Sequence, residues 1–232
     1  MIRLKKQIKT ALASVALASG FLPRYVAGRL SGQAAVLMYH RVLPDQARAD
    51  SYSADGIIVS PDTFRLQMQI LRRRFHPLSL PEYVAHLEEG RFPDNSCLVT
   101  FDDGWFDNHE YALPILEGTR VPAAVFIATD YIGTGRCFWQ ESLSRLLAHA
   151  AGLGGAAVSM FAGLARPDVP GLASGSRKLA IRQCIDGLKH RSIAEVAELT
   201  TRVEDVLRTH GMSQSPLHSD RSMNWEQVTT PA

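Results

Sequence analysis

The sequence predicts an α/β protein in which strands alternate with helices. Three short apolar runs, at 34–39, 97–101 and 123–128, have the length and composition of buried strands. The segments between them carry apolar side chains at helical spacing, so the predicted order is strand, helix, strand, helix, strand. This alternation favours a parallel sheet or a barrel.

The helices between the strands have recognisable beginnings. Ser60 is a candidate N-cap, and Pro61 suits the first helical position that follows it. Apolar residues then recur at helical spacing: Phe64, Met68, Leu71 and Phe75. A second helix is predicted at 80–87, with its cap near Ser79.

The pattern changes in the second half of the sequence. A helix predicted at 108–116, with Gly118 as its stop, leads to the last of the three strands. From there the apolar spacing predicts only helices, at 139–151, 177–189 and 193–210. We therefore expect a helical insertion or the start of a second domain after the third strand.

Charge is distributed unevenly along the chain. The net charge is +2, but residues 1–44 hold seven basic residues and no acidic ones. This asymmetry indicates a basic arm on a slightly acidic body, and because basic and aromatic residues do not interleave further on, no nucleic-acid partner is expected. The sequence has no apolar run of 18 residues that would predict a membrane-spanning helix.

The N-terminal arm, residues 1–33, fits three interpretations. It resembles a short signal peptide, with a charged start followed by an Ala-rich run. It also has the spacing of an amphipathic helix that would contact an anionic membrane surface. A surface helix packed on the domain is the third. Export, a membrane-surface location and a cytoplasmic location therefore all stay open.

The three cysteines, Cys97, Cys137 and Cys184, are odd in number and widely spaced. No Cys-x-x-Cys pair is present, so a cysteine zinc site is not predicted. Buried free thiols are the expected state.

The segment that best predicts chemistry is 100–105, which reads TFDDGW. Asp102 and Asp103 follow a buried strand, and active sites of parallel sheets and barrels lie at that end of the strands. Two adjacent carboxylates repel each other unless a cation lies between them, so a divalent metal with a neighbouring general base is one interpretation. An ordinary polar turn ending at Gly104 is the other.

Several segments together resemble one family. Residues 100–104 (TFDDG) are similar to the first motif of the polysaccharide deacetylases, the NodB-homology or carbohydrate esterase 4 family. Residues 36–42 (VLMYHRV) and 121–128 (VPAAVFIA) resemble the strands on either side of this motif in one branch of the family. Residues 138–147 (FWQESLSRLL) resemble the start of that branch's helical insertion.

The resemblance implies a distorted (β/α) barrel of which this chain holds the N-terminal part. It implies four segments: a basic amphipathic or targeting segment at 1–33, the first part of the barrel at 34–138, a helical insertion at 139–220 and a return to the barrel at 221–232. The implied reaction is the metal-dependent hydrolysis of N-acetyl or O-acetyl groups on a carbohydrate polymer.

The resemblance also implies residue roles. Asp102 would be the general base, and Asp103 would bind a divalent metal, zinc before others. Such a metal polarises the acetyl carbonyl and lowers the pKa of its bound water to about 7. His40 follows the first strand, so it would bind substrate at the same rim.

One departure from the family concerns the metal. The family completes its site with two histidines four residues apart, in the pattern His-Ser/Thr-x-x-His. This sequence has eight histidines, and no two of them are four apart. Residues 221–228 resemble the segment that leads to this second motif, and four residues later the sequence ends. We expect a chain truncated before the motif, impaired in activity and marginally stable, or completed by a second chain.

Other functions compete with this hypothesis. A non-catalytic remnant, or a module that binds carbohydrate or a protein partner, is the main alternative. Phosphoryl transfer through an aspartyl nucleophile is disfavoured, because that chemistry usually uses two aspartates separated by one residue. The acetylated polymer stays open among chitin-like polymers, peptidoglycan, exopolysaccharide and xylan.

Overall fold

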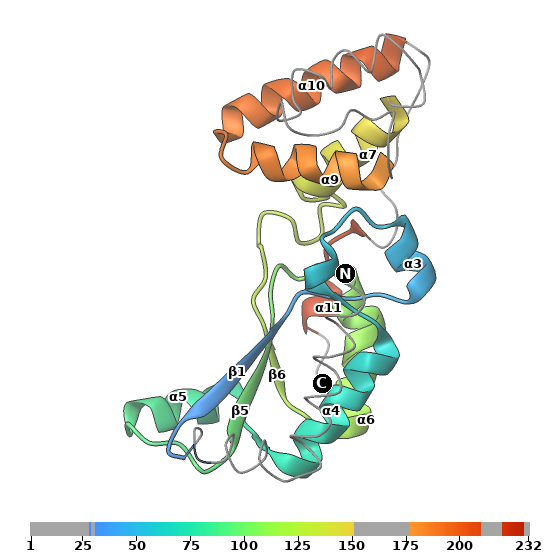
Figure 1. Cartoon of the computed structure of the whole chain (residues 1–232). Coiled ribbons are helices and arrows are strands. Elements are labelled where there is room, and N and C mark those ends of the chain that lie inside the picture. Colours follow the sequence, from blue (N-terminus) through green and yellow to red (C-terminus); the bar gives the residue numbers. More distant parts are fainter. Residues whose placement is uncertain (1–27, 29–30, 151–176, 210–219, 230–232) are drawn as a thin grey trace. The chain divides into compact units, whose positions relative to one another are not determined.

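The computed structural model describes residues 28, 31–150, 177–209 and 220–229 (Figure 1). Almost all of the predicted N-terminal arm lies outside the described residues. The chain divides into two compact units, which we describe separately. Unit 1 contains the described residues up to Tyr39 together with 62–102 and 113–126, and unit 2 contains 40–61, 103–112 and the described residues from Ile127 onward.

Unit 1 is built on a parallel sheet centred on β5 (Ser96–Phe101). Strand β1 (Ala34–Tyr39) pairs with β5 over its whole length, from Ala34 opposite Ser96 to Tyr39 opposite Phe101. Strands β4 (His76–Pro77) and β6 (Ala123–Val125) pair in parallel with the first two and last three residues of β5. The α/β class with a parallel sheet is confirmed, and the described strands do not close into a barrel.

Helix α4 (Pro61–Arg74) packs on one face of this sheet through the residues that the spacing predicted. Its Phe64 ring lies 5.1 Å from that of Tyr39 and 5.6 Å from that of Phe101, both edge-on. On the opposite face of β1, Met38 is 63% exposed. Helix α4 therefore covers one face of the sheet in unit 1 (Figure 1), and the exposed Met38 side chain lies on the other face.

The other helices of unit 1 differ slightly from the prediction. Helix α5 (Leu80–Glu88) begins with a capping box, in which Ser79 and Glu82 bond to each other's backbone. Helix α6 (Leu113–Thr119) continues through Gly118, which was wrongly expected to end it, and the chain leaves the helix at Arg120 with a φ of 54°. A left-handed residue after the last turn ends a helix whichever residue type adopts it.

Several other boundaries also differ. The third strand stops at Val125, three residues earlier than predicted. The predicted helix at 108–116 begins as a π-helical turn, Asn108–Ala112, in unit 2. The sequence did not predict β4, or the two-residue strands β2 (Arg41–Val42) and β3 (Ile58–Val59), because so short a segment shows no periodicity.

Unit 2 contains the predicted helices, confirmed to within one residue as α7 (Trp139–Ala150), α9 (Arg177–Leu188) and α10 (Ile193–Thr209). They bury a shared apolar core, which includes Leu143, Leu147, Ile181, Val203 and Leu207. The remaining elements of unit 2 are short: α3 (Asp45–Asp50), a 3-10 turn (Asp55–Ile57) and α11 (Trp225–Thr229).

Candidate functional site

The residues predicted to form a site directly follow two paired strands. Tyr39 and Phe101 lie opposite each other as the last residues of β1 and β5. Asp102 extends this pairing, because its backbone N–H donates to the carbonyl oxygen of Tyr39 at 3.0 Å. His40 and Asp102 thus begin the segments that leave the carboxyl ends of neighbouring parallel strands, where sites are built in such sheets.

A tight turn follows Asp102. Asp103 has a φ of 76° and Gly104 a φ of 74°, so two consecutive residues are left-handed. A Cβ on Gly104 would lie 3.0 Å from Cγ2 of Ile127, so this position requires glycine for space as well as for conformation. Asp103 tolerates the left-handed region less easily, which places local strain at the motif.

Trp105 fixes the carboxylate of Asp103. The Nε1–H of Trp105 donates to Oδ2 of Asp103 at 3.0 Å. The indole is itself held rigidly, because it is only 2% exposed and packs against Phe138 at 4.8 Å between ring centroids. Trp105 was included in the sequence motif but was assigned no role. An indole N–H two residues after a carboxylate could have predicted this hydrogen bond.

A buried polar cluster of unit 2 lies under this tryptophan. The guanidinium carbon of Arg41 is 4.1 Å from the Trp105 ring centroid, and Arg41 is fully buried. Arg41 donates from Nε to Oδ2 of Asp107 at 3.0 Å and from Nη1 to Oδ1 of Asp220 at 3.1 Å. Arg145 of α7 completes the cluster through its own bond to Asp220. Arg41, counted in the sequence among the basic residues of the N-terminal region, is therefore a core residue.

Burial raises the pKa of two acidic side chains in and beside this cluster. Burial raises the pKa of Asp107 to about 6, although the nearby Arg41 charge and the Val42 backbone N–H oppose the shift. Burial also raises the pKa of Glu141, which accepts a hydrogen bond from the Ser53 hydroxyl at 2.8 Å. Both pKa shifts favour the protonated carboxyl group over the carboxylate.

His40 is fixed through its backbone. Its carbonyl oxygen accepts a hydrogen bond from Nδ2 of Asn108 at 2.8 Å, and its side chain is half-buried. The predicted substrate contact of the His40 side chain stays a prediction.

The described residues do not form a metal site. Asp103 offers one carboxylate, and in the part of the chain that the structure describes no three His, Cys, Asp or Glu side chains are grouped to hold an ion. Zinc sites in proteins take at least three such ligands, so these residues do not fit the predicted ion.

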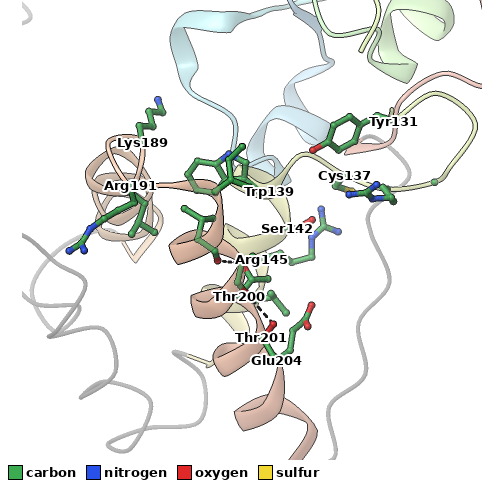
Figure 2. A pocket seen from close by; sticks show the side chains of 17 residues that line it. Tyr131, Cys137, Trp139, Ser142, Arg145, Lys189, Arg191, Thr200, Thr201 and Glu204 are labelled. Atoms are coloured by element: carbon green, nitrogen blue, oxygen red, sulfur yellow. Dashed lines mark hydrogen bonds between the residues drawn. The ribbon is translucent and has the colours of Figure 1, made fainter. Parts of the chain in front are cut away.

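Among the cavities that the described residues of unit 2 line, two differ clearly in volume. The smaller, which we call the Asp103 cavity, has a volume of about 240 Å³. It is lined by Tyr52, Asp103, Trp105, Phe138, Gln140 and Arg182, among others. The larger, of about 820 Å³, lies between α7 and α10 (Figure 2). Acidic residues already neutralise two of its cations, since Arg145 pairs with Asp220 and Arg191 with Glu195.

Among the described residues, none of the helices has the length and hydropathy needed to cross a membrane. The predicted signal peptide or amphipathic segment cannot be compared with this finding, because it lies outside that part of the chain.

Comparison with known proteins supports the resemblance. Residues 89–153 match the family model described as polysaccharide deacetylase. A poly-beta-1,6-N-acetyl-D-glucosamine N-deacetylase of Staphylococcus epidermidis is 30% identical over 109 residues, which cover 44% of this chain and 38% of that protein. The chain thus matches well under half the length of this curated relative.

Solved structures of similar proteins exist. A deacetylase of Streptococcus pyogenes, solved in complex with acetate, shares 30% identity over 41% of this chain and 42% of its own, with a TM-score of 0.36. IcaB from Ammonifex degensii shares 21% identity over 84% of this chain and 94% of its own, with a TM-score of 0.38. The sequence homology to the polysaccharide deacetylase family, the NodB-homology or carbohydrate esterase 4 family, covers part of the chain.

Proposed function

We propose that the chain is a polysaccharide deacetylase-like protein that acts on N-acetyl, or O-acetyl, groups of a carbohydrate polymer. The supporting observation is the position of Asp102 and Asp103 directly after the central strand β5, with the left-handed turn beginning at Asp103. Parallel sheets build their active sites at this end of the strands. The family membership of residues 89–153 supplies the reaction class.

The proposed roles follow the sequence resemblance. Asp102 is the general base that takes a proton from the attacking water. Asp103 would bind a divalent metal, with zinc the first candidate, only where ligands from outside the described residues complete the site, and His40 contacts the substrate. The Trp105 hydrogen bond supports the role of Asp103, because it fixes the orientation of one carboxylate oxygen.

In this proposal the sheet of unit 1 is the N-terminal part of a distorted (β/α) barrel that extends over 34–138. Residues 139–220 are a helical insertion, and 221–232 return to the barrel. The three helices that share one apolar core in unit 2 support the insertion.

Hydrolysis by these 232 residues alone is proposed to be impaired. No two of the eight histidines are four residues apart, so Asp103 lacks the paired imidazoles that the family motif would bring. A second chain that carries such a pair would be the partner needed for full activity.

The test is acetate release from N-acetylglucosamine oligomers, with and without added zinc. We expect slow release that Asp102→Asn lowers by roughly 10²-fold, the usual contribution of a general base. Asp130→Asn, which changes an exposed aspartate, is the matched control and should leave the rate unchanged. A rate equal in the unaltered chain and Asp102→Asn would contradict catalysis by Asp102.

A second candidate is a non-catalytic module that binds carbohydrate. The Asp103 cavity favours it, because aromatic and polar side chains line a space of about 240 Å³ beside the motif. Sugar binding without any acetate release would support this candidate over the hydrolase.

A further inference from the structure

A short segment from the far end of the described chain, residues 220–223, lies against the left-handed turn of the motif, and we call it the strap. Trp105 and Ser222 form an isolated antiparallel bridge. Beside this pair, the N–H of Phe106 donates to the carbonyl oxygen of Arg221 at 2.9 Å. All of these residues belong to unit 2. The motif turn is therefore paired with a segment from a distant part of the sequence.

Met223 ties the strap to two neighbouring segments. Its N–H donates to the carbonyl oxygen of Gly104 at 2.9 Å, and its own carbonyl oxygen accepts from the N–H of Gly133 at 2.9 Å. The Met223 side chain is buried. Asp103 is left-handed, and a residue other than glycine keeps that conformation where its surroundings fix it. The strap supplies part of these surroundings.

The strap begins at a buried carboxylate. Asp220 is 1% exposed, and each of its two oxygens accepts a hydrogen bond from an arginine. Oδ1 accepts from Nη1 of Arg41 at 3.1 Å, and Oδ2 accepts from Nη2 of Arg145 in α7. Charge-assisted bonds from two guanidinium groups hold a carboxylate in one orientation. Asp220 therefore fixes the start of the strap relative to Arg41.

Arg41 connects this carboxylate to the indole of Trp105. Its guanidinium carbon lies 4.1 Å from the Trp105 ring centroid. Asp107 holds the same guanidinium through Nε at 3.0 Å, so two carboxylates keep it in place. A guanidinium held in this way packs against the ring face and restricts tilting of the ring. The indole that Arg41 supports is the one that donates to Asp103.

We propose that Asp220 is a positioning residue for the carboxylate of Asp103. It holds Arg41 under the Trp105 indole and begins the strap that pairs with the turn. The indole then keeps one oxygen of the Asp103 carboxylate in place. Through Arg145, the same aspartate connects the site with the helical core of unit 2. The consequence for hydrolysis rests on the proposed function; the positioning of the carboxylate does not.

The test is ¹H–¹⁵N NMR of the full chain, labelled with ¹⁵N at its three tryptophans. The indole signal that is lost in Trp105→Phe is that of Trp105. Asp220→Asn keeps the size of the side chain and removes its charge. In this variant we expect the Trp105 indole signal to shift upfield, because its hydrogen bond to Asp103 is weakened, or to split into two. An unchanged signal in the folded variant would overturn the proposal.

Leu147→Ala is the matched control, because it separates positioning from a general loss of stability. Leu147 is fully buried in the core of α7, α9 and α10 and takes no part in the hydrogen bonds of the strap. The substitution leaves a cavity, so the urea midpoint should fall while the Trp105 signal stays in place. A shift as large as that in Asp220→Asn would show that the signal follows stability alone, and the proposal would be rejected.

Arg41→Lys covers the case in which Asp220→Asn does not fold. Lysine keeps the positive charge but has no planar fork, so it cannot bond both acids and also lie flat under the ring. The Trp105 signal should shift in the same direction as expected for Asp220→Asn. If it does not move, the proposal is wrong.

Acetate release by the same variants separates this proposal from the proposed function. A shifted Trp105 signal, with kcat lowered at least about tenfold and KM unchanged, would support both. A shifted signal with unchanged acetate release would retain the positioning role and reject hydrolysis through Asp103. An unshifted signal would reject the positioning role at any rate of acetate release.

Discussion

The indole of Trp105 and the carboxylate of Asp103, two residues apart, are joined by a hydrogen bond of 3.0 Å from Nε1 to Oδ2. The bond spans the left-handed turn, since Gly104 lies between the two residues. The indole is buried in unit 2 and the carboxylate is half-buried, so a buried side chain fixes the orientation of the more accessible carboxylate. The orientation of the motif thus depends on packing beneath it.

Trp105→Phe tests this bond. The phenylalanine ring keeps the contact with Arg41 and Phe138 but has no N–H, so we expect the free energy of unfolding to fall by about 1–2 kcal/mol. Urea unfolding followed by circular dichroism measures it. Trp225→Phe, at a residue 52% exposed, is the control and should change stability by less than about 0.5 kcal/mol. Equal effects of the two substitutions would show that the indole N–H contributes nothing.

Arg41→Met tests the buried cluster. The substitution leaves Asp107 and Asp220 without their shared cation, and breaking a buried ion pair typically costs about 3–5 kcal/mol. Thermal or urea unfolding should show this loss. Arg65→Met, at an exposed position of α4, serves as the matched control and should be nearly neutral. A small effect at Arg41 would mean that its two acids find other partners or become protonated without cost.

The raised pKa of Asp107 predicts that the free energy of unfolding depends on pH. Its pKa is raised from 3.8 to about 6 in the folded state, so the folded state binds the proton more tightly than the unfolded state does. The stability contributed by this proton is complete below pH 3.8 and is lost as the pH rises through about 6.

Urea unfolding of the unaltered chain and of Asp107→Asn, at intervals between pH 4 and pH 7, checks this prediction. The asparagine does not titrate, so the stability of the unaltered chain relative to the variant should fall across this window and level off above it. A difference that rises with pH would contradict the raised pKa.

Gly104→Ala tests the turn that carries the motif. An alanine there would be left-handed, and its Cβ would lie 3.0 Å from Ile127. Gly90→Ala is a matched control, because Gly90 has a similar φ of 72° with nothing within 4 Å of the added Cβ. We expect a loss of about 1–2 kcal/mol at Gly90 from the backbone alone and a larger loss at Gly104. Equal losses in urea unfolding would mean that Ile127 moves aside freely.

Much of the fold could be predicted because its signals are local. Apolar spacing predicted α4, α7, α9 and α10, and short apolar runs predicted β1 and β5, since a helix or a strand shows its own period in sequence. The boundaries were less accurate. Gly118 was taken as a helix stop, but the left-handed residue that ends α6 is Arg120.

The candidate site, like the fold, has features that the sequence could predict and features that it could not. The sequence by itself showed the resemblance to the family and predicted the place of Asp102 and Asp103 after a buried strand, because residue identity and strand composition are written along the chain. Only the tertiary structure decided what holds Asp103. The indole of Trp105 donates to Asp103 and packs against the buried guanidinium of Arg41. Arg41 in turn is bonded to Asp220, which lies 179 residues further along the chain. Contacts over such separations leave no periodic trace in a single sequence, so Arg41 could be counted there only as one more positive charge.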